Sequence, residues 1–310
     1  MKAEHFTFSN EKGQDIYVYR WLPKKDCRIK GVLQISHGMA EHAGRYERLA
    51  DFLTQHGYII YANDQRGHGK TAGHIDNVGY IGEDGFSGMV LDMKQLTDII
   101  KMEYPGMPLI VLGHSMGSFL TQRYIQRWGQ GIEGAILSGS NGERGLDIKL
   151  AIGIARLQAF LLGKRKRSRL LKFLTFSVYN SAFRPARTPF DWLSRDKDEV
   201  DEYIADKYCG GVYTTSFFLD FFRLLDKLYD REAAGRIPKD LSLNIISGAM
   251  DPVGGQGKGV RKLIDFYKGL GLNNVSSKLY PGARHELLNE VNRDEVMEDI
   301  LLWLVGKTKG

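Results

Sequence analysis

The sequence has few of the features that mark several large classes of protein. Its 310 residues include only two cysteines, Cys27 and Cys209, and no Cys-x-x-Cys pair. A disulfide framework is therefore excluded. Two thiols could still form one bridge, but this usage is typical of a reducing compartment. The apolar fraction is 43% and the charged fraction 26%, an ordinary globular mixture that excludes collagen and low-complexity disorder.

Long hydrophobic runs are also missing. The best apolar stretch, residues 150–162, is shorter than the roughly 18 residues of a membrane-spanning helix and is interrupted by Arg156 and Gln158. The N-terminal segment MKAEHFTFSNEKGQD has no apolar core of the kind found in a secretory signal. We therefore expect a soluble, cytoplasmic protein.

The charge is nearly balanced, with a formal net charge of +6. An excess of this size indicates solubility and weak attraction to anions. It is concentrated between Lys164 and Arg169, where five of six residues are cationic. Two interpretations of this basic cluster remain open: a solvated surface, or a contact with anionic membrane lipids next to an apolar segment.

Alternating strands and helices dominate both ends of the chain. The apolar patterns predict strands at residues 5–9, 16–22, 29–36, 58–62, 109–113, 132–137, 241–247 and 275–280. They predict helices at residues 45–56, 86–104, 116–128, 258–270 and 293–305. The first two strands should form an antiparallel hairpin, and single helices between the later strands imply parallel crossovers. We predict an α/β fold with a mostly parallel central sheet and helices on both faces.

The alternation stops between about residues 141 and 235. This part contains helical segments, including residues 146–162, but no convincing apolar strand. We therefore predict one α/β core, built from residues 1–140 and 236–310, that is split by a helical insertion at residues 141–235. No internal repeat is present.

The strongest chemical signal is Gly113-His114-Ser115-Met116-Gly117, a Gly-x-Ser-x-Gly motif between a predicted strand and a predicted helix. That context is typical of a nucleophile elbow, in which a strained turn lifts the serine hydroxyl above the sheet. Gly113 and Gly117 avoid collisions with neighbouring backbone. The Met116 N–H at the helix N-terminus would stabilise an oxyanion. The alternative is a glycine-rich turn with no chemistry.

A serine nucleophile needs a base and an acid that orients it. His285 is the only histidine after Ser115, and it follows the predicted strand 275–280. Asp251 follows the preceding strand, so both side chains should reach the carboxyl edge of the sheet. The alternatives are a structural histidine and an Asp-Pro turn. We predict Ser115, His285 and Asp251 as the catalytic residues.

An early strand ends at His37-Gly38-Met39, where its loop should pass close to the elbow. We predict the Met39 backbone N–H as the second oxyanion donor, beside that of Met116. His37 and Gly38 would support this turn.

The motifs together carry a family resemblance. In chain order they are His37-Gly38-Met39-Ala40-Glu41-His42 with Arg45-Tyr46, Asp64-Gln65-Arg66-Gly67-His68-Gly69, Gly113-His114-Ser115-Met116-Gly117, Asp251 and Gly282-Ala283-Arg284-His285. Over nearly the whole core the chain resembles the monoacylglycerol lipase/lysophospholipase group of serine α/β-hydrolases. The resemblance implies an α/β-hydrolase fold, a Ser115–Asp251–His285 triad, Met39 as oxyanion donor and a cap at residues 141–235. One departure is Ser118, where the family usually has a second glycine.

The expected activity is hydrolysis of a carboxylic ester through an acyl-enzyme. The expected substrate is a single-chain acyl lipid, either a monoacylglycerol or a lysophospholipid, and no cofactor is implied. Four phenylalanines of the insertion either contact the acyl chain or pack the cap on the core: Phe217, Phe218, Phe221 and Phe222. An acyltransferase and an aminopeptidase remain open, and the latter would need an acidic group such as Asp196, Asp198, Glu199, Asp201 or Glu202.

Three other classes of site are rejected. The segment 67–72 fits Gly-x-Gly-x-x-Ala, but a P-loop would need glycine at Asp64 and no helix follows as in a dinucleotide fold. We expect Asp64 and Arg66 to brace this turn through a charge-assisted hydrogen bond. The spacing of His37, Glu41 and His42 does not match a metal motif. No nucleic-acid motif is present.

Overall fold

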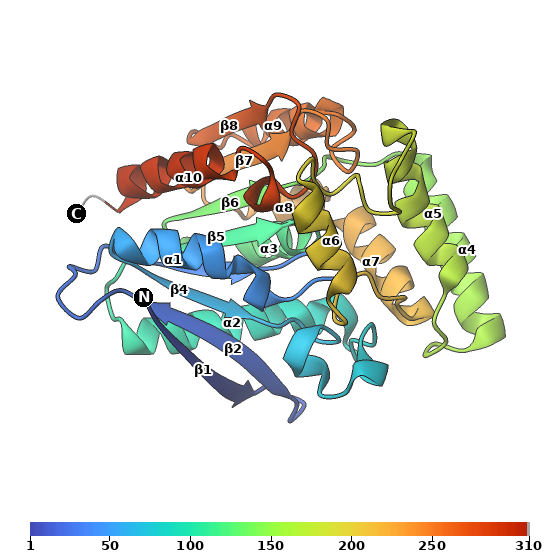
Figure 1. Cartoon of the computed structure of the whole chain (residues 1–310), viewed down its shortest axis with the longest axis horizontal. Coiled ribbons are helices and arrows are strands. Elements are labelled where there is room, and N and C mark those ends of the chain that lie inside the picture. The colour runs from blue at the N-terminus through green and yellow to red at the C-terminus, as the bar shows by residue number, and fades with distance from the viewer. Residues whose placement is uncertain (309–310) are drawn as a thin grey trace.

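A computed structural model describes residues 1–308 of the chain and is built around one eight-stranded sheet (Figure 1). The strand order is β1-β2-β4-β3-β5-β6-β7-β8. The pairs β1–β2 and β2–β4 are antiparallel, and every later pair is parallel. The predicted N-terminal hairpin and the mostly parallel sheet are both confirmed.

The element boundaries lie close to those expected from the apolar patterns. The strands are β1 Lys2–Ser9, β2 Asp15–Leu22, β3 Gly31–Ser36, β4 Tyr58–Asn63, β5 Leu109–His114, β6 Gly134–Ser138, β7 Ser242–Gly248 and β8 Val275–Tyr280. The core helices are α1 Glu47–Gln55, α2 Gly85–Glu103, α3 Met116–Trp128, α9 Lys258–Gly269 and α10 Arg293–Lys307. A short 3₁₀ turn, Ala43–Tyr46, forms what was predicted as the first turn of α1.

The sheet is covered on both faces, because its apolar strands divide their side chains between two cores. On β3, Val32 joins the core formed with α2 and α3, whereas Leu33 and Ile35 join the core formed with α1 and α10. This alternation has the two-residue period of a strand. It explains why continuous apolar runs predict buried strands in a parallel sheet.

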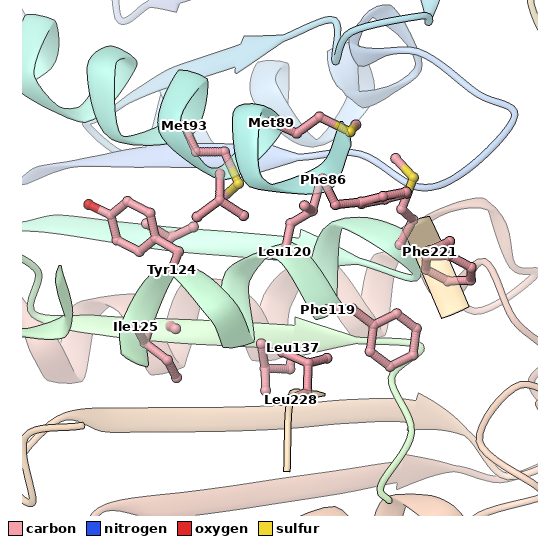
Figure 2. Close-up of a cluster of buried hydrophobic side chains, with 14 of the residues drawn as sticks. Phe86, Met89, Met93, Phe119, Leu120, Tyr124, Ile125, Leu137, Phe221 and Leu228 are labelled. Carbon is pink, nitrogen blue, oxygen red and sulfur yellow. The ribbon is translucent and has the colours of Figure 1, made fainter. Parts of the chain in front are cut away.

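Figure 2 shows the core between α2 and α3. Met89 and Met93 of α2 lie opposite Leu120 and Tyr124 of α3, and all four side chains are fully buried. Phe221 of α7 joins the same core, with its ring 5.9 Å from that of Phe119. The helices between β6 and β7 therefore share a hydrophobic core with the sheet domain.

The chain between β6 and β7 forms only helices in the part that the structure describes, apart from one isolated bridge. These helices are α4 Leu146–Leu162, α5 Arg169–Asn180, α6 Lys197–Ala205, α7 Thr215–Lys227 and α8 Arg231–Gly235. α7 packs on α2 and α4 packs on α7, while α4 and α5 lie at the outer edge of the molecule (Figure 1). The domain limits 1–140, 141–235 and 236–310 stay a prediction.

The expected hydrogen bond between Asp64 and Arg66 is wrong. Asp64 instead accepts from the backbone N–H groups of Ala43, at 2.8 Å, and Lys70, at 2.6 Å. Arg66 donates to both oxygens of Asp92 on α2, at 2.5 and 2.7 Å. The long guanidinium side chain reaches a buried carboxylate that sequence proximity does not reveal. The two residues do brace the turn, but through different partners.

Within residues 1–308, no helix combines the length and hydrophobicity that crossing a bilayer requires.

Candidate active site

Ser115 lies on a sharp turn between β5 and α3, with φ 50° and ψ −117°. A non-glycine residue in this region is strained and persists only where the surrounding structure holds it. Here the two flanking glycines make the turn sterically accessible. A Cβ at Gly117 would collide with the Ser36 carbonyl oxygen, and a Cβ at Gly113 would collide with the Gly117 carbonyl oxygen. The geometry is that of a nucleophile elbow.

Ser118, the departure from the family pattern, is part of a buried polar contact beneath this turn. Its hydroxyl lies 2.6 Å from the Ser115 carbonyl oxygen and 2.8 Å from the Ser140 hydroxyl. Gln122 donates to the same Ser140 oxygen at 3.0 Å. A serine at position 118 is therefore accommodated by hydrogen bonds and does not disturb the elbow.

The loops after β7 and β8 bring Asp251 and His285 together. His285 Nδ1 lies 3.0 Å from each Asp251 carboxylate oxygen, and both side chains are buried. The Val253 N–H donates to Asp251 at 2.8 Å, and the Ser247 hydroxyl donates at 3.2 Å. The carboxylate is held in one orientation and fixes the imidazole through Nδ1, while Nε2 has no hydrogen-bond partner among residues 1–308.

The pKa of His285 is raised above its ordinary value of 6.5. Burial is the largest single effect and opposes protonation. The Asp251 charge and its hydrogen bond to Nδ1, with the charges of Glu286 and Glu41 adding, outweigh burial. The site therefore stabilises an imidazolium, which a general base becomes when it accepts the proton of a serine.

This shift predicts the acidic limb of the pH profile. A base must be neutral to act, so kcat/KM is expected to fall as the pH drops through a value above 6.5. Asp251→Asn removes the interaction that raises the pKa, so the limb moves to lower pH while kcat falls by roughly 10⁴-fold. The measurement is ester hydrolysis between about pH 5 and pH 9.

The matched control for this prediction is Asp240→Asn, because Asp240 is exposed and lies before β7, at the opposite end of that strand. Its profile should match that of the wild type. An unmoved acidic limb in Asp251→Asn would show that another group titrates.

Ser115 and His285 face the same cavity but are not hydrogen-bonded to each other. Both line a space of about 30 Å³, together with Glu41, Tyr203 and Glu286 among others. Within residues 1–308 the Ser115 hydroxyl makes no hydrogen bond. Catalytic hydrogen bonds are often long without substrate and shorten when it binds, so this arrangement is compatible with a nucleophile and its base.

The backbone N–H groups of Met39 and Met116 are available to bind an oxyanion. Neither has an acceptor among residues 1–308. The neighbouring Gly38 N–H donates to Glu41 at 2.5 Å. His37 accepts from the Gln65 N–H at Nε2 and so donates from Nδ1 to the Gly38 carbonyl, at 2.8 Å. Burial lowers the pKa of His37 to about 3, so this support stays neutral.

Two tyrosines of the insertion, not predicted from the sequence, hold the same loop. Ala40 has φ 60°, another strained conformation. Its N–H donates to the Tyr213 hydroxyl at 3.0 Å, and its carbonyl accepts from the Tyr203 hydroxyl at 2.9 Å and from the Gly210 N–H at 3.0 Å. A lone tyrosine in the insertion carries no sequence signal for such a contact.

Tyr213→Phe is expected to lower kcat by at least roughly tenfold and to leave KM nearly unchanged. Ala40 then loses the acceptor of its N–H, and the preceding Met39 amide loses its alignment, whereas full loss of an oxyanion donor costs about 10²–10³-fold. The control is Tyr124→Phe, because Tyr124 is equally buried and donates to Thr97 at 3.0 Å away from the site. Equal kcat values for the two variants would rule out a positioning role for Tyr213.

Arg45 forms a buried ion network beside the predicted base. It donates to both oxygens of Glu286, at 2.7 and 2.8 Å, and to Glu41 at 3.0 Å. The Tyr46 hydroxyl donates to the other Glu41 oxygen at 2.9 Å. Because Glu286 directly follows His285 in the chain, the network anchors the loop that carries the imidazole.

A second cavity of about 50 Å³ also borders Ser115. We call it the phenylalanine-side cavity because Phe119, Phe221 and Phe222 line it, and we call the first one the glutamate-side cavity. Phe217 and Phe218 line neither cavity and are fully buried. All four phenylalanines pack the insertion on the core, and Phe221 and Phe222 also line a cavity. Whether these two contact an acyl chain stays a prediction.

One trio of metal-type ligands occurs within residues 1–308, formed by His42, Asp206 and Cys209. Their ligand atoms lie within 4.8 Å, but His42 Nε2 and Asp206 are already hydrogen-bonded at 2.7 Å. His42 Nδ1 accepts from the Gly44 N–H at 3.2 Å, so Nε2 carries the proton that Asp206 accepts. A metal ion bound at Nε2 would require the ring proton to be on Nδ1. There it would face the Gly44 N–H, which is also a donor. The trio does not fit a metal ion.

Comparisons with known proteins show the family and the fold of the chain. The family model described as serine aminopeptidase, S33, matches residues 28–292. The chain is 30% identical to a monoacylglycerol lipase of Mycolicibacterium smegmatis over 98% of each chain. It is 28% identical to a monoglyceride lipase of Homo sapiens over 96% of this chain and 89% of that one. A carboxyl esterase from Bacillus coagulans, solved in complex with glycerol, has a TM-score of 0.91 and 28% identity over 99% of each chain.

Proposed function

We propose, because this chain belongs to the serine aminopeptidase S33 family of α/β-hydrolases, that it hydrolyses carboxylic esters of single-chain acyl lipids. We expect monoacylglycerols to be its preferred substrates. The observation that carries the proposal is Ser115 on its strained turn, facing one cavity with the buried His285–Asp251 pair. The names of the relatives from Mycolicibacterium smegmatis and Homo sapiens support this substrate class.

In the proposed mechanism Ser115 attacks the ester carbonyl while His285 accepts the hydroxyl proton. Asp251 stabilises the imidazolium, which then gives the proton to the leaving alcohol. The Met39 and Met116 N–H groups bind the oxyanion of the tetrahedral intermediate. Water, activated by the same imidazole, hydrolyses the acyl-enzyme and releases the fatty acid.

The two cavities give the substrate a direction. The phenylalanine-side cavity suits an acyl chain, because aromatic and aliphatic side chains dominate its lining. The glutamate-side cavity offers Glu41, Tyr203 and Glu286 to a polyol leaving group. A volume of about 50 Å³ is far below the range of about 300–1,000 Å³ that is usual for small-molecule sites. The helices of the insertion, which we propose act as a cap, must therefore move for a long chain to enter.

The aminopeptidase alternative receives no support from the acidic residues of the segment 196–202. An aminopeptidase needs a carboxylate that faces the amine of its substrate. None of the five acids considered for this role lines either cavity. Asp196 accepts from Arg293, Glu199 from Arg48, and Asp201 from Arg187. Glu41 and Glu286 do line the glutamate-side cavity, but Arg45 already forms an ion pair with each of them.

The direct test compares fatty-acid release from a monoacylglycerol and from a lysophosphatidylcholine of the same chain length. We expect faster release from the monoacylglycerol, because the named relatives are monoacylglycerol lipases and because Arg45 already binds both glutamate-side carboxylates. Faster release from the lysophospholipid would move the assignment to that class. Release from neither substrate above the Ser115→Ala background would remove the lipid assignment.

We further propose that α4, α5 and the basic cluster Lys164–Arg169 contact anionic membranes. Ten of the sixteen large hydrophobic side chains exposed in residues 1–308 lie on these two helices: Leu146, Leu150, Leu157, Phe160, Leu161, Leu162, Leu170, Phe173, Leu174 and Val178. Within the described chain no cation of the cluster forms a salt bridge, although Arg165 stacks on Tyr80 and Arg167 donates to two carbonyls. Apolar and cationic groups together are typical of an interfacial surface.

Co-sedimentation with anionic and neutral vesicles tests this contact. The variant Lys164→Gln/Lys166→Gln/Arg169→Gln should bind anionic vesicles at least roughly tenfold more weakly, since each cation contributes about 1 kcal/mol near a charged surface. The control, Lys24→Gln/Lys25→Gln/Arg28→Gln, changes three exposed cations after β2, on the opposite side of the molecule (Figure 1). Equal binding by the two variants would end this proposal.

A cytoplasmic location is part of the proposal. The structure leaves Cys27 and Cys209 as free thiols, a state that a reducing compartment maintains.

A further inference from the structure

A groove lies outside the two cavities at Ser115, along one face of α5. It has a volume of about 420 Å³ and is bounded by α5 and by the segment 181–190. The α5 residues that line it include Arg169, Lys172, Phe173 and Phe176, spaced at three and four residues along one helical face. Its volume lies within the range of about 300–1,000 Å³ that is usual for small-molecule sites.

The lining of the groove combines apolar surface with positive charge. Phe173, Phe176 and Phe190 supply aromatic surface, and Phe173 is 63% exposed. Three cations also line the groove: Arg169, Lys172 and Arg184. No acidic residue belongs to the lining, and none of these cations forms a salt bridge within residues 1–308. An uncompensated charge beside exposed rings is complementary to an anionic amphiphile.

The groove is separated from the candidate active site by single side chains. Lys172, Phe176 and Phe190 line both the groove and the glutamate-side cavity. Lys172 Nζ donates to the Gly210 carbonyl at 2.5 Å, and the Gly210 N–H donates to Ala40 at 3.0 Å. An anion that binds Lys172 from the groove side would therefore act on the loop that presents the Met39 N–H.

We propose that this groove binds an anionic amphiphile with a single acyl chain, its head on the three cations and its chain along the phenylalanines. Guanidinium groups pair with carboxylates and with phosphates through two hydrogen bonds, so either head fits. The head is the carboxylate of a free fatty acid or the phosphate of a lysophospholipid. Binding in the groove does not depend on the proposed function. Only one interpretation rests on it, namely that a bound fatty acid is the product released by the enzyme itself.

Binding is tested in the Ser115→Ala background, so that no ligand is hydrolysed and the result does not depend on the proposed reaction. The ligands are oleate, 1-oleoyl-lysophosphatidate and mono-oleoylglycerol, each below its micellar concentration, measured by equilibrium dialysis. The test variant is Arg169→Gln/Arg184→Gln, since neither arginine lines the cavities at Ser115. The control is Arg156→Gln/Arg231→Gln, two exposed arginines outside the groove. Far-ultraviolet circular dichroism checks the fold of each variant.

We expect one anionic ligand per chain to bind in the groove, whereas mono-oleoylglycerol, the proposed substrate, should bind the cavities at Ser115 with equal affinity in the test variant and the control. The Arg169→Gln/Arg184→Gln variant should lose at least tenfold in affinity for the anionic ligand, and the control should lose none. Tighter binding of oleate identifies a fatty acid as the ligand, and tighter binding of the phosphate identifies a lysophospholipid. Unchanged affinity of the test variant for both anionic ligands overturns the proposal. If that variant does not fold, Phe173→Gln must weaken both anionic ligands instead.

Discussion

Ser115→Ala is expected to lower kcat for ester hydrolysis by roughly 10⁴-fold or more, because the only proposed nucleophile is removed. The backbone should tolerate the change, since alanine and serine have the same Cβ in the strained conformation at φ 50°. The measurements are kcat with a chromogenic ester and the mass increase after treatment with a fluorophosphonate. Wild type should gain one phosphonyl group, and the variant none.

Ser118→Ala is the matched control, because Ser118 lies in the first turn of α3, three residues after Ser115, and its hydroxyl contacts the Ser115 carbonyl. It removes a neighbouring hydroxyl without touching the reaction. Loss of that hydrogen bond costs about 1 kcal/mol of stability, and the mass label should remain. Retention of more than a tenth of wild-type activity in Ser115→Ala would disprove the nucleophile assignment.

Arg45→Met is expected to lower the free energy of unfolding by about 3–5 kcal/mol, the usual cost of leaving a buried charge without its partner. Glu41 and Glu286 would remain 3% and 6% exposed with no cation between them. The present pair with Arg45 holds the pKa of Glu286 at about 2 although burial acts in the opposite direction. In the variant the carboxylates must take up protons or open the loop, so kcat should fall as well.

Urea unfolding measures this effect, with Arg236→Met as the control. Arg236 pairs with Glu232 at 3.0 Å on an exposed surface, and such pairs contribute about 0–1 kcal/mol. Protonation of Glu41 and Glu286 relieves their repulsion in Arg45→Met. The difference in unfolding free energy between the two variants should therefore become smaller as the pH falls towards 4. Equal unfolding free energies at neutral pH would mean that water already compensates the buried network.

The sheet and its helices are predictable from this sequence because local pattern and final environment agree. A run such as residues 58–62 has too many adjacent apolar side chains for a half-exposed strand, and β4 is indeed buried on both faces. The positions of Ser115, Asp251 and His285 are predictable for a related reason. Each follows a parallel strand, and all such strands end at one edge of the sheet.

The supporting contacts are not predictable in this way, because they join residues far apart in the chain. Glu286 lies 241 residues from Arg45, and Tyr213 lies 173 residues from Ala40. Nothing local distinguishes these side chains from ordinary polar surface. The incorrect pairing of Asp64 with Arg66 has the same origin, since the real partner of Arg66 lies on α2. The prediction pairs residues that are close in the sequence, whereas the actual hydrogen-bond partners are set by proximity in the folded structure.

The hydrogen bonds of Ala40 with Tyr203 and Tyr213 also limit how this enzyme can be re-engineered. Exchanging the helices between β6 and β7 for those of another hydrolase is an obvious route to new substrates. Here such a graft would also remove two of the groups that hold a strained residue of the core in place. A chimera that replaces α4 and α5 but retains the stretch 203–213 keeps both. Substrate selectivity can then be redesigned without a loss of catalytic rate. The junctions of such a chimera are best chosen from these hydrogen bonds and not from the apparent ends of the insertion.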